Sequence, residues 1–231
     1  MRHEEPTSRT CSLTDPKVRA VLDRLHAEAG GQTLGLARLL ASFAFDKLLR
    51  HEVSVAEEAA RLKDLYVCLS PKQGVFAYQA ARSIGARRIV EFGTSFGVSA
   101  IYFAAAVRDN GGGVVIGSEI EPGKVARARD NIEAAGLSAY VEIREGDAQE
   151  TLRDPGGPLD LVLLDGFKTL YLPIIRLLTP HLHPGSVVLG DNIFTFRQAL
   201  APYVAHMQDP ANGFSSVTLF LGDGMEYSVR L

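Results

Sequence analysis

Apolar positions divide the chain into two parts that differ in their period. Up to about residue 86, apolar residues recur at the three- and four-residue spacing of amphipathic helices. Thr14 or Asp15, followed by Pro16, is typical of a helix start, and Gly30 with Gly31 is typical of a helix end. The spacing predicts four helices, over residues 16–30, 34–49, 55–66 and 73–84.

From Arg88 onward, short apolar runs alternate with helical segments, which is typical of a parallel sheet covered by helices on both faces. The predicted strands are residues 88–92, 114–120, 141–145, 159–165 and 186–191. The predicted helices between them are residues 99–107, 123–135, 149–152 and 172–178. The end differs, because Gly222-Asp223-Gly224 between two further apolar runs predicts a β-hairpin over residues 216–231.

The length of 231 residues suits one α/β domain with a helical extension. We assign residues 1–12 to a flexible tail, 13–86 to the extension and 87–231 to the core. The net charge of -3 gives no general attraction to nucleic acid or to anionic membranes. Cys11 and Cys68 lack metal-site spacing. Neither a signal peptide nor a membrane-spanning run is apparent. Together these features predict a cytoplasmic protein.

A glycine-containing loop, Val90-Glu91-Phe92-Gly93-Thr94-Ser95-Phe96-Gly97, follows the first predicted strand. Its Gly-x-x-x-Gly spacing is not the Gly-x-Gly-x-x-Gly of dinucleotide enzymes, which favours a ligand without a diphosphate. S-adenosylmethionine is such a ligand. Glu119 ends the second strand, where a carboxylate can accept hydrogen bonds from both ribose hydroxyls, and Asp147-Ala148 follows the third strand, placed to contact adenine. Each feature alone would fit a turn, a solvated carboxylate or a helix cap; their order at successive strand ends favours a cofactor site.

Two carboxylates and an amide follow two other buried strands. Asp165 comes after Leu161–Leu164, and Asp191 with Asn192 comes after Ser186–Gly190. If these strands are neighbours, the oxygens converge at one sheet edge and suit Mg²⁺, with Mn²⁺ or Ca²⁺ as alternatives. A cation nearby would favour the neutral form of Lys168, which could then act as a base. Taken alone, these residues would also fit polar strand ends and a turn.

From about Leu69 to Leu231 the chain resembles the metal-dependent, S-adenosylmethionine-using O-methyltransferases of the catechol and caffeoyl-coenzyme-A type. The shared motifs lie at residues 90–97, 118–122, 146–149, 164–168, 171–173, 190–192 and 221–224. The resemblance implies a class I methyltransferase fold, a Rossmann-like sheet of seven strands with the last antiparallel, and a homodimer. It implies Asp165, Asp191 and Asn192 as metal ligands and Lys168 as the catalytic base. The implied methyl-donor contacts are Leu69, Glu91, Gly93, Ser95, Ser99, Glu119, Ile120, Ala148 and Asp165.

The chain departs from the catechol-specific enzymes in one place. Those enzymes carry a substrate-binding carboxylate just before the final hairpin, whereas residues 216–220 here read Ser-Val-Thr-Leu-Phe. We therefore predict metal-assisted methyl transfer to a small phenolic or vicinal-diol acceptor without specifying catechol. Two alternatives stay open at this point: a methyltransferase acting on a hydroxylated RNA base, which the absence of a basic excess disfavours, and a non-catalytic S-adenosylmethionine-binding protein.

Overall fold

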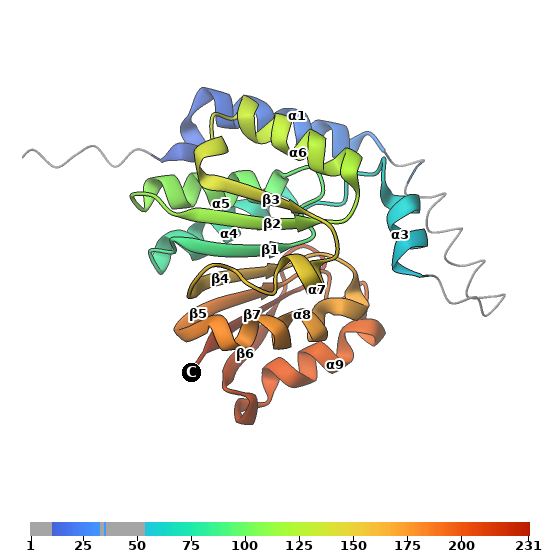
Figure 1. Ribbon diagram of the computed structural model, residues 1–231, viewed down its shortest axis with the longest axis vertical. Helices are drawn as coiled ribbons and strands as arrows, with labels where there is room; N and C mark the ends of the chain where they lie inside the picture. Colours follow the sequence, from blue (N-terminus) through green and yellow to red (C-terminus); the bar gives the residue numbers. More distant parts are fainter. Residues whose placement is uncertain (1–10, 33–34, 36–53) are drawn as a thin grey trace, which may run out of the picture.

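A computed structural model describes residues 11–32, 35 and 54–231 of the chain. Within these residues, seven strands form one sheet in the order β3-β2-β1-β4-β5-β7-β6 (Figure 1). The strands are β1 (Arg88–Phe92), β2 (Val114–Glu119), β3 (Val141–Glu145), β4 (Leu159–Leu164), β5 (Leu182–Gly190), β6 (Phe214–Leu219) and β7 (Met225–Arg230). Strands β1 to β5 are parallel, and β7 lies antiparallel between β5 and β6. The predicted seven-stranded sheet and its antiparallel last strand are confirmed.

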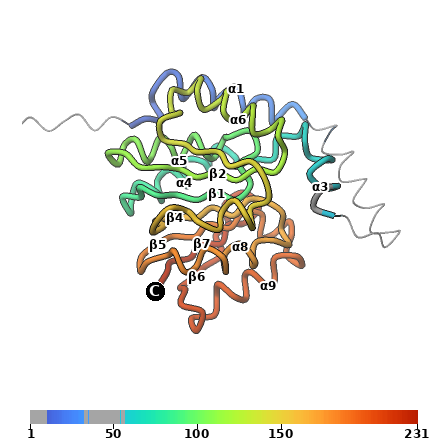
Figure 2. Tube along the Cα trace, viewed as in Figure 1, coloured from blue at the N-terminus to red at the C-terminus, as the bar shows by residue number. Residues whose placement is uncertain are grey.

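The helices form two groups on the two faces of the sheet. One group comprises α1 (Pro16–Gly30), α4 (Pro71–Ser83), α5 (Val98–Asp109) and α6 (Pro122–Ala134). The other comprises α7 (Ala148–Thr151), α8 (Tyr171–Leu178) and α9 (Arg197–Gln208). Figure 2 traces the chain from α1, at one end of the sheet, to the C-terminal strands at the other.

The uninterrupted apolar runs of the central strands serve both faces, because successive side chains of a strand point to opposite sides. On β4, Leu161 and Leu163 pack into the core under α1, α4 and α5, while Val162 and Leu164 pack into the core under α8 and α9. All four side chains are fully buried. Burial of each contributes about 1.5–3 kcal/mol to folding, so the central strands form a rigid platform for their polar ends.

The predicted helix over residues 34–49 lies outside the described residues, apart from Gly35. Two other details differ from the sequence expectations. Helix α9 was not predicted, since Pro202 interrupts its interior and is normally a helix breaker. Strand β5 begins at Leu182 instead of Ser186, because a register irregularity against β4 accommodates the Pro184-Gly185 pair.

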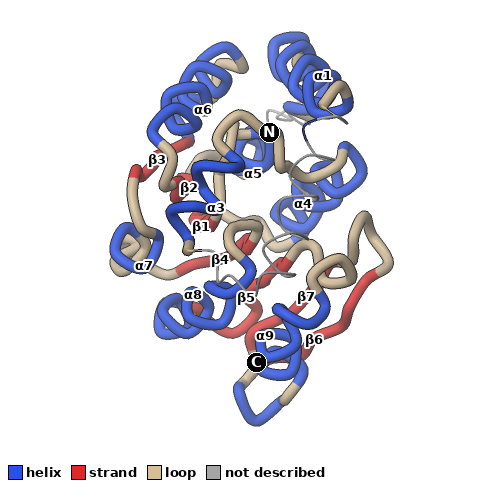
Figure 3. Tube along the Cα trace, turned by 90° about the vertical axis from the view of Figure 1, so that its right-hand side faces the viewer, coloured by secondary structure: helices blue, strands red, loops and turns tan. Residues whose placement is uncertain are grey.

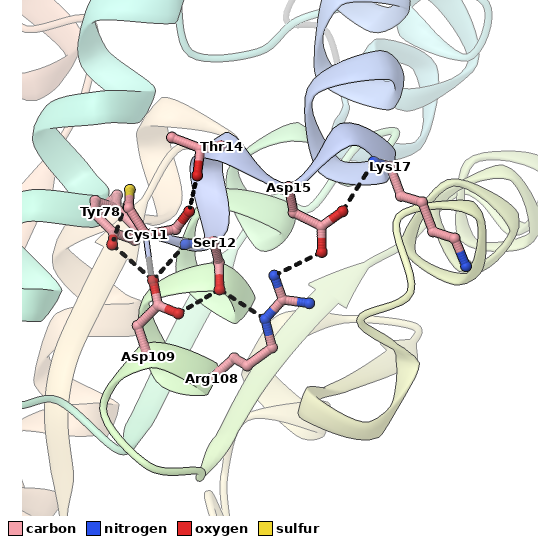
Figure 4. Close-up of polar contacts among 8 residues, drawn as sticks. All are labelled: Cys11, Ser12, Thr14, Asp15, Lys17, Tyr78, Arg108 and Asp109. Carbon is pink, nitrogen blue, oxygen red and sulfur yellow. Dashed lines mark hydrogen bonds and ion pairs between the residues drawn. The ribbon is translucent and has the colours of Figure 1, made fainter. Parts of the chain in front are cut away.

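The predicted tail, residues 1–12, lies outside the described residues except for Cys11 and Ser12. Ser12 is buried, and its backbone N–H donates to Asp109 Oδ2 at 2.7 Å (Figure 4). Arg108 Nε donates to Ser12 Oγ at 2.7 Å, and the Tyr78 hydroxyl donates to Asp109 Oδ2 at 2.8 Å. These contacts fasten the start of the described chain to α4 and α5.

Helix α3 (Val55–Leu62) lies over the carboxyl ends of the parallel strands, on the side that faces the viewer in Figure 3. A capping box defines its start: Ser54 Oγ accepts from Glu57 N, and the Glu57 carboxylate accepts from Ser54 N at 2.9 Å. Among the described residues, no helix is long and apolar enough to cross a membrane.

Candidate active site

The ends of neighbouring strands are joined by backbone hydrogen bonds. Asp165 N donates to Phe92 O at 2.9 Å, and Asp191 N donates to Leu164 O at 3.0 Å. On the other side of β1, Gly93 N donates to Ser118 O at 3.1 Å. The polar residues that follow β1, β2, β4 and β5 therefore lie along one edge of the sheet, where open α/β sheets bind ligands.

The loop after β1 requires glycine at two points. Gly93 has φ +94°, and a Cβ on it would lie 2.7 Å from both Asp165 O and the Gly166 backbone. Gly97 has φ +88° and precedes the first turn of α5. Ser95 between them also adopts a left-handed conformation, with φ +51°, which is uncommon for a non-glycine residue. The loop backbone is thus pressed against the turn that carries Asp165.

Glu91 is fully buried at the end of β1, and neither carboxylate oxygen has a hydrogen-bond partner among the described residues. Burial raises the pKa of the Glu91 carboxyl to about 7, and the nearby Ser99 and Thr94 hydroxyls offset only part of that rise. The hydroxyls of Thr94 and Ser95 are also buried without a partner. Because buried polar groups are normally paired, this cluster has the character of a ligand cradle that a cationic group would complete.

Glu119 connects the ends of β1 and β2. Its Oε2 accepts from Ser95 N at 2.8 Å, and its Oε1 accepts from Ile120 N at 2.9 Å and from Glu121 N at 3.0 Å. A carboxylate oxygen has two lone pairs, so Oε1 is fully used by the two backbone amides, whereas Oε2 keeps one lone pair for a ligand hydroxyl. The structure therefore places Ser95, Glu119 and Ile120 together.

Three of the predicted donor-contacting residues have side chains committed elsewhere. Leu69 is fully buried in the core, and Ala148 is buried at the start of α7. Asp147 is exposed, and its carboxylate caps α7 by accepting from Gln149 N at 2.9 Å. Contacts of Leu69 or Asp147 with a ligand would have to come from their backbone.

Asp165 and Asp191 form a pair of buried carboxylates at the ends of β4 and β5. Burial raises the pKa of Asp165, and the charge of Lys168 counteracts this. Burial also raises the pKa of Asp191 to about 7, and the neighbouring charge of Asp165 adds to the rise. Asn192 has a left-handed φ of +64° and donates from Nδ2 to Asp191 Oδ2 at 3.2 Å. Such strained residues persist where the surrounding structure fixes them, often at functional sites.

Lys168 lies between the carboxylates of Asp165 and Asp191 and two aromatic side chains, those of Tyr171 and Phe196. Its Nζ donates to the Tyr171 hydroxyl at 2.9 Å and lies 3.4 Å from Asp165 Oδ1. The Tyr171 hydroxyl in turn donates to Asp191 O at 3.2 Å, so one chain of contacts joins Lys168 to both strand ends. The ammonium also lies 5.6 Å from the centre of the Phe196 ring.

The donor chemistry of this group fits a hard divalent cation. Two buried carboxylates repel one another, and an adjacent amide can supply a third oxygen ligand. Among the described residues, no group of three or more His, Cys, Asp or Glu side chains could hold a metal ion. A cation here would therefore depend on Asp165, Asp191 and the Asn192 amide, with water or an acceptor completing its shell.

Three exposed aromatic side chains follow the ends of β5 and β6, and one of them, Phe196, lies beside Lys168. Phe194 and Phe196 are each 42% exposed, so neither side chain belongs to the core. Phe220 is 95% exposed, and its ring lies 5.1 Å from that of Phe194. Backbone bonds from Ile193 N to Gly224 O and from Phe194 N to Asp223 O hold these segments together. The arrangement provides flat apolar surface next to the polar centre.

Sequence reasoning missed two residues near this centre. Gln73 donates from Nε2 to Asp191 Oδ1 at 2.6 Å. Burial raises the pKa of Glu58, on α3, and the charge of Lys168 offsets part of that rise, so the two side chains lie near one another. The Ser70-x-x-Gln73 pattern indicates a helix cap, but nothing local in the sequence indicates its contact with a residue 118 positions away.

Known proteins are similar to this chain in sequence and fold. A family described as a methyltransferase domain matches residues 90–193. A catechol O-methyltransferase of Niastella koreensis is 32% identical over 158 residues, which cover 67% of this chain and 69% of that protein. A catechol O-methyltransferase of Mycobacterium tuberculosis is 35% identical over 139 residues, covering 60% of this chain and 61% of that protein.

The chain belongs to the O-methyltransferases of the catechol type. The family and enzyme class predicted from the sequence are thereby confirmed. A solved O-methyltransferase of this fold, TomG from Streptomyces achromogenes in complex with SAM, has a TM-score of 0.65 and 25% identity. The similarity covers 81% of this chain and 94% of that one, so the likeness extends well beyond residues 90–193.

Proposed function

We propose that this O-methyltransferase transfers the methyl group of S-adenosylmethionine to a hydroxyl of a small phenolic or vicinal-diol acceptor, assisted by a divalent cation such as Mg²⁺. The observation that carries the proposal is Glu91, a fully buried carboxylate without a hydrogen-bond partner among the described residues, at the tip of the strand that leads to Gly93. The amino-acid part of the donor offers the ammonium group that such a carboxylate requires.

The donor would be held by groups that follow three strands. Glu91, Ser95 and Ser99 would surround its amino-acid part, while Gly93 and Gly97 allow the ligand to approach the backbone. The carboxylate of Glu119 would accept from the ribose hydroxyls, and the backbone around Asp147 and Ala148 would border the adenine. Bound donor supplies an electrophilic methyl group on a sulfonium.

Asp165, Asp191 and Asn192 would hold the cation, which when bound supplies Lewis-acid polarisation of the acceptor hydroxyl. Lys168 would accept the proton of that hydroxyl at Nζ. The Tyr171 hydroxyl fixes the position of Nζ, because it accepts from Lys168 while donating to the backbone of Asp191. Helix α3, which brings Glu58 towards Lys168, would limit access of water.

The aromatic surface supports a phenolic acceptor. Phe196 offers a ring face beside Lys168, and the exposed, paired rings of Phe194 and Phe220 extend the apolar surface suited to a flat aromatic body. The stretch before the hairpin loop contains no carboxylate, so recognition of a second hydroxyl by an acidic side chain at that position is not part of the proposal. A homodimer and a cytoplasmic location remain predictions from the sequence, and the N-terminal helices of residues 13–86 are proposed to shape the acceptor pocket.

Calorimetry and a methyl-transfer screen test the proposal together. S-adenosylhomocysteine should bind the purified protein and raise its Tm by mass action, whereas NAD should do neither. The screen should include vicinal-diol phenolics and bulk transfer RNA, each with Mg²⁺ and with chelator. Methylation of the RNA alone would support the nucleic-acid alternative, and donor binding without transfer to any acceptor would support a non-catalytic protein.

A further inference from the structure

Gln73 links the N-terminal helices to the candidate metal site. It is the third residue of α4 and is 4% exposed. Its Oε1 accepts from Ser70 N at 3.0 Å and from Ser70 Oγ at 2.7 Å, forming the capping box of α4. At the other end of the same amide, Nε2 donates to Asp191 Oδ1 at 2.6 Å.

The partners of Gln73 determine which way its amide points. Ser70 N can only donate, so it must face the amide oxygen. This orientation turns the NH₂ group of Gln73 towards Asp191. A helix-capping side chain usually lies at the surface, whereas this one is buried against a residue from the opposite part of the chain.

The loop between β6 and β7 closes over the amide. Gly222 has φ +57°, and a Cβ on it would lie only 2.4 Å from Gln73 Cδ. Such an approach is open only to glycine, so the backbone of this loop and the Gln73 side chain hold each other in place. The same loop binds the segment after Asn192 through Gly224 O and Asp223 O.

Each oxygen of the Asp191 carboxylate accepts one hydrogen bond, and the backbone of the residue is held as well. Oδ1 accepts from Gln73 and Oδ2 accepts from Asn192, while the Asp191 backbone is bonded to Leu164 and to Tyr171. Of these contacts, the one from Gln73 is the shortest. It is also the one that comes from the N-terminal helices and not from the sheet or its adjoining turns.

We propose that Gln73 is a positioning residue that orients the Asp191 carboxylate for a divalent cation. The proposal rests on the metal assignment of the proposed function. The amide restricts rotation of the carboxylate and leaves the second lone pair of Oδ1 for the cation. Residues that orient metal ligands in this way typically change metal affinity by about 10–100-fold when they are removed.

The test measures Mn²⁺ binding without turnover, by the electron paramagnetic resonance signal of free Mn²⁺. Gln73→Met keeps the length of the side chain but removes both the cap acceptor and the donor to Asp191. Its Kd for Mn²⁺ should be about 10-fold or more weaker than that of the wild type. Its affinity for S-adenosylhomocysteine, measured by calorimetry, should stay within about twofold of the wild type, since the defect lies in the metal ligand.

Ser70→Ala is the matched control, because it weakens the same helix cap from the other side and leaves the Gln73–Asp191 contact. It should lower Tm to a similar extent while keeping the wild-type affinity for Mn²⁺. Unchanged Mn²⁺ affinity in Gln73→Met would overturn the proposal, and so would an equal loss of affinity in Ser70→Ala. If the wild type itself binds no Mn²⁺, the metal assignment fails first and the positioning role falls with it.

Gly222→Ala provides a second route if Gln73→Met does not fold. The new methyl group would displace the Gln73 amide while both Ser70 and Gln73 are retained. Mn²⁺ affinity should again fall by about 10-fold or more, and the wild-type Kd in this variant would contradict the proposal.

Discussion

The Glu91→Gln variant separates the stability of the empty protein from its affinity for the donor. The folded protein holds a proton on Glu91 up to a pKa of about 7, compared with 4.5 for an ordinary glutamate, because burial disfavours the charged form. The folded state therefore binds this proton more tightly than the unfolded chain. As pH rises from 4.5 to about 7, the group lowers the free energy of unfolding, and the loss is complete above that pH.

At pH 8 the ionisation of Glu91 lowers the free energy of unfolding by about 3 kcal/mol. Glutamine has the same shape and cannot ionise, so the variant should be more stable than the wild type at pH 8 by up to about 3 kcal/mol, and nearly equal to it at pH 4. The opposite holds for ligand binding. Without the carboxylate, affinity for S-adenosylhomocysteine should fall by about 1.5–3 kcal/mol, the usual worth of a hydrogen bond to a charged group.

Urea unfolding from pH 4 to pH 8 and calorimetry at pH 8 measure the two effects. Glu145→Gln, which removes an exposed carboxylate from the end of β3, controls for the change in net charge. In the wild type, donor affinity should also weaken as pH falls below about 7, because a proton then competes for Glu91. A Glu91→Gln protein with wild-type stability at pH 8 and undiminished donor affinity would refute both the buried-charge argument and the assignment of the cradle.

Three further predictions follow from the same geometry. Glu119→Ala should weaken donor binding by about 1.5–3 kcal/mol in calorimetry, and an unchanged Kd would mean that Glu119 serves only the backbone amides of its turn. Lys168→Ala should lower kcat by about 10²–10⁴-fold, with partial rescue at high pH. Lys168→Arg should stay inactive because guanidinium remains protonated, and a fully active Arg variant would limit Lys168 to an electrostatic role. Gly93→Ala should lose donor affinity and lower Tm, since its Cβ would lie 2.7 Å from the backbone of the Asp165 turn, and wild-type values of both would show that the turn moves freely.

The sheet could be predicted from the sequence because its signals are local. Apolar runs such as Leu161–Leu164 are long enough for a strand, and each ends in a polar residue that marks the functional edge. Helix α9 escaped prediction because Pro202 contradicts its local pattern, whereas burial of Leu200, Tyr203 and Met207 compensates in the folded protein. Tertiary packing there outweighs propensity.

The site could be predicted only as a set of residue types at strand ends. Asp165 lies close to Asp191 because β4 and β5 are neighbours in the sheet. The sequence predicts this proximity only on the condition that these two strands are adjacent. Gln73 could not be found in this way, since its amide meets Asp191 through the packing of α4 against the hairpin loop. The exposure of Phe194 and Phe196 likewise depends on where a loop leaves the sheet, which apolar character alone does not reveal.

The central claim is that Asp165, Asp191 and Asn192 hold a cation that assists methyl transfer to a hydroxyl. Transfer of a labelled methyl group from S-adenosylmethionine to the best vicinal-diol phenolic acceptor tests it most directly, in wild type and in Asp191→Ala, with Mg²⁺ and after exhaustive chelation. We expect turnover in wild type with Mg²⁺, its loss on chelation, its return on adding Mg²⁺, and no turnover in Asp191→Ala despite nearly intact affinity for S-adenosylhomocysteine. Full wild-type turnover after chelation would contradict the account.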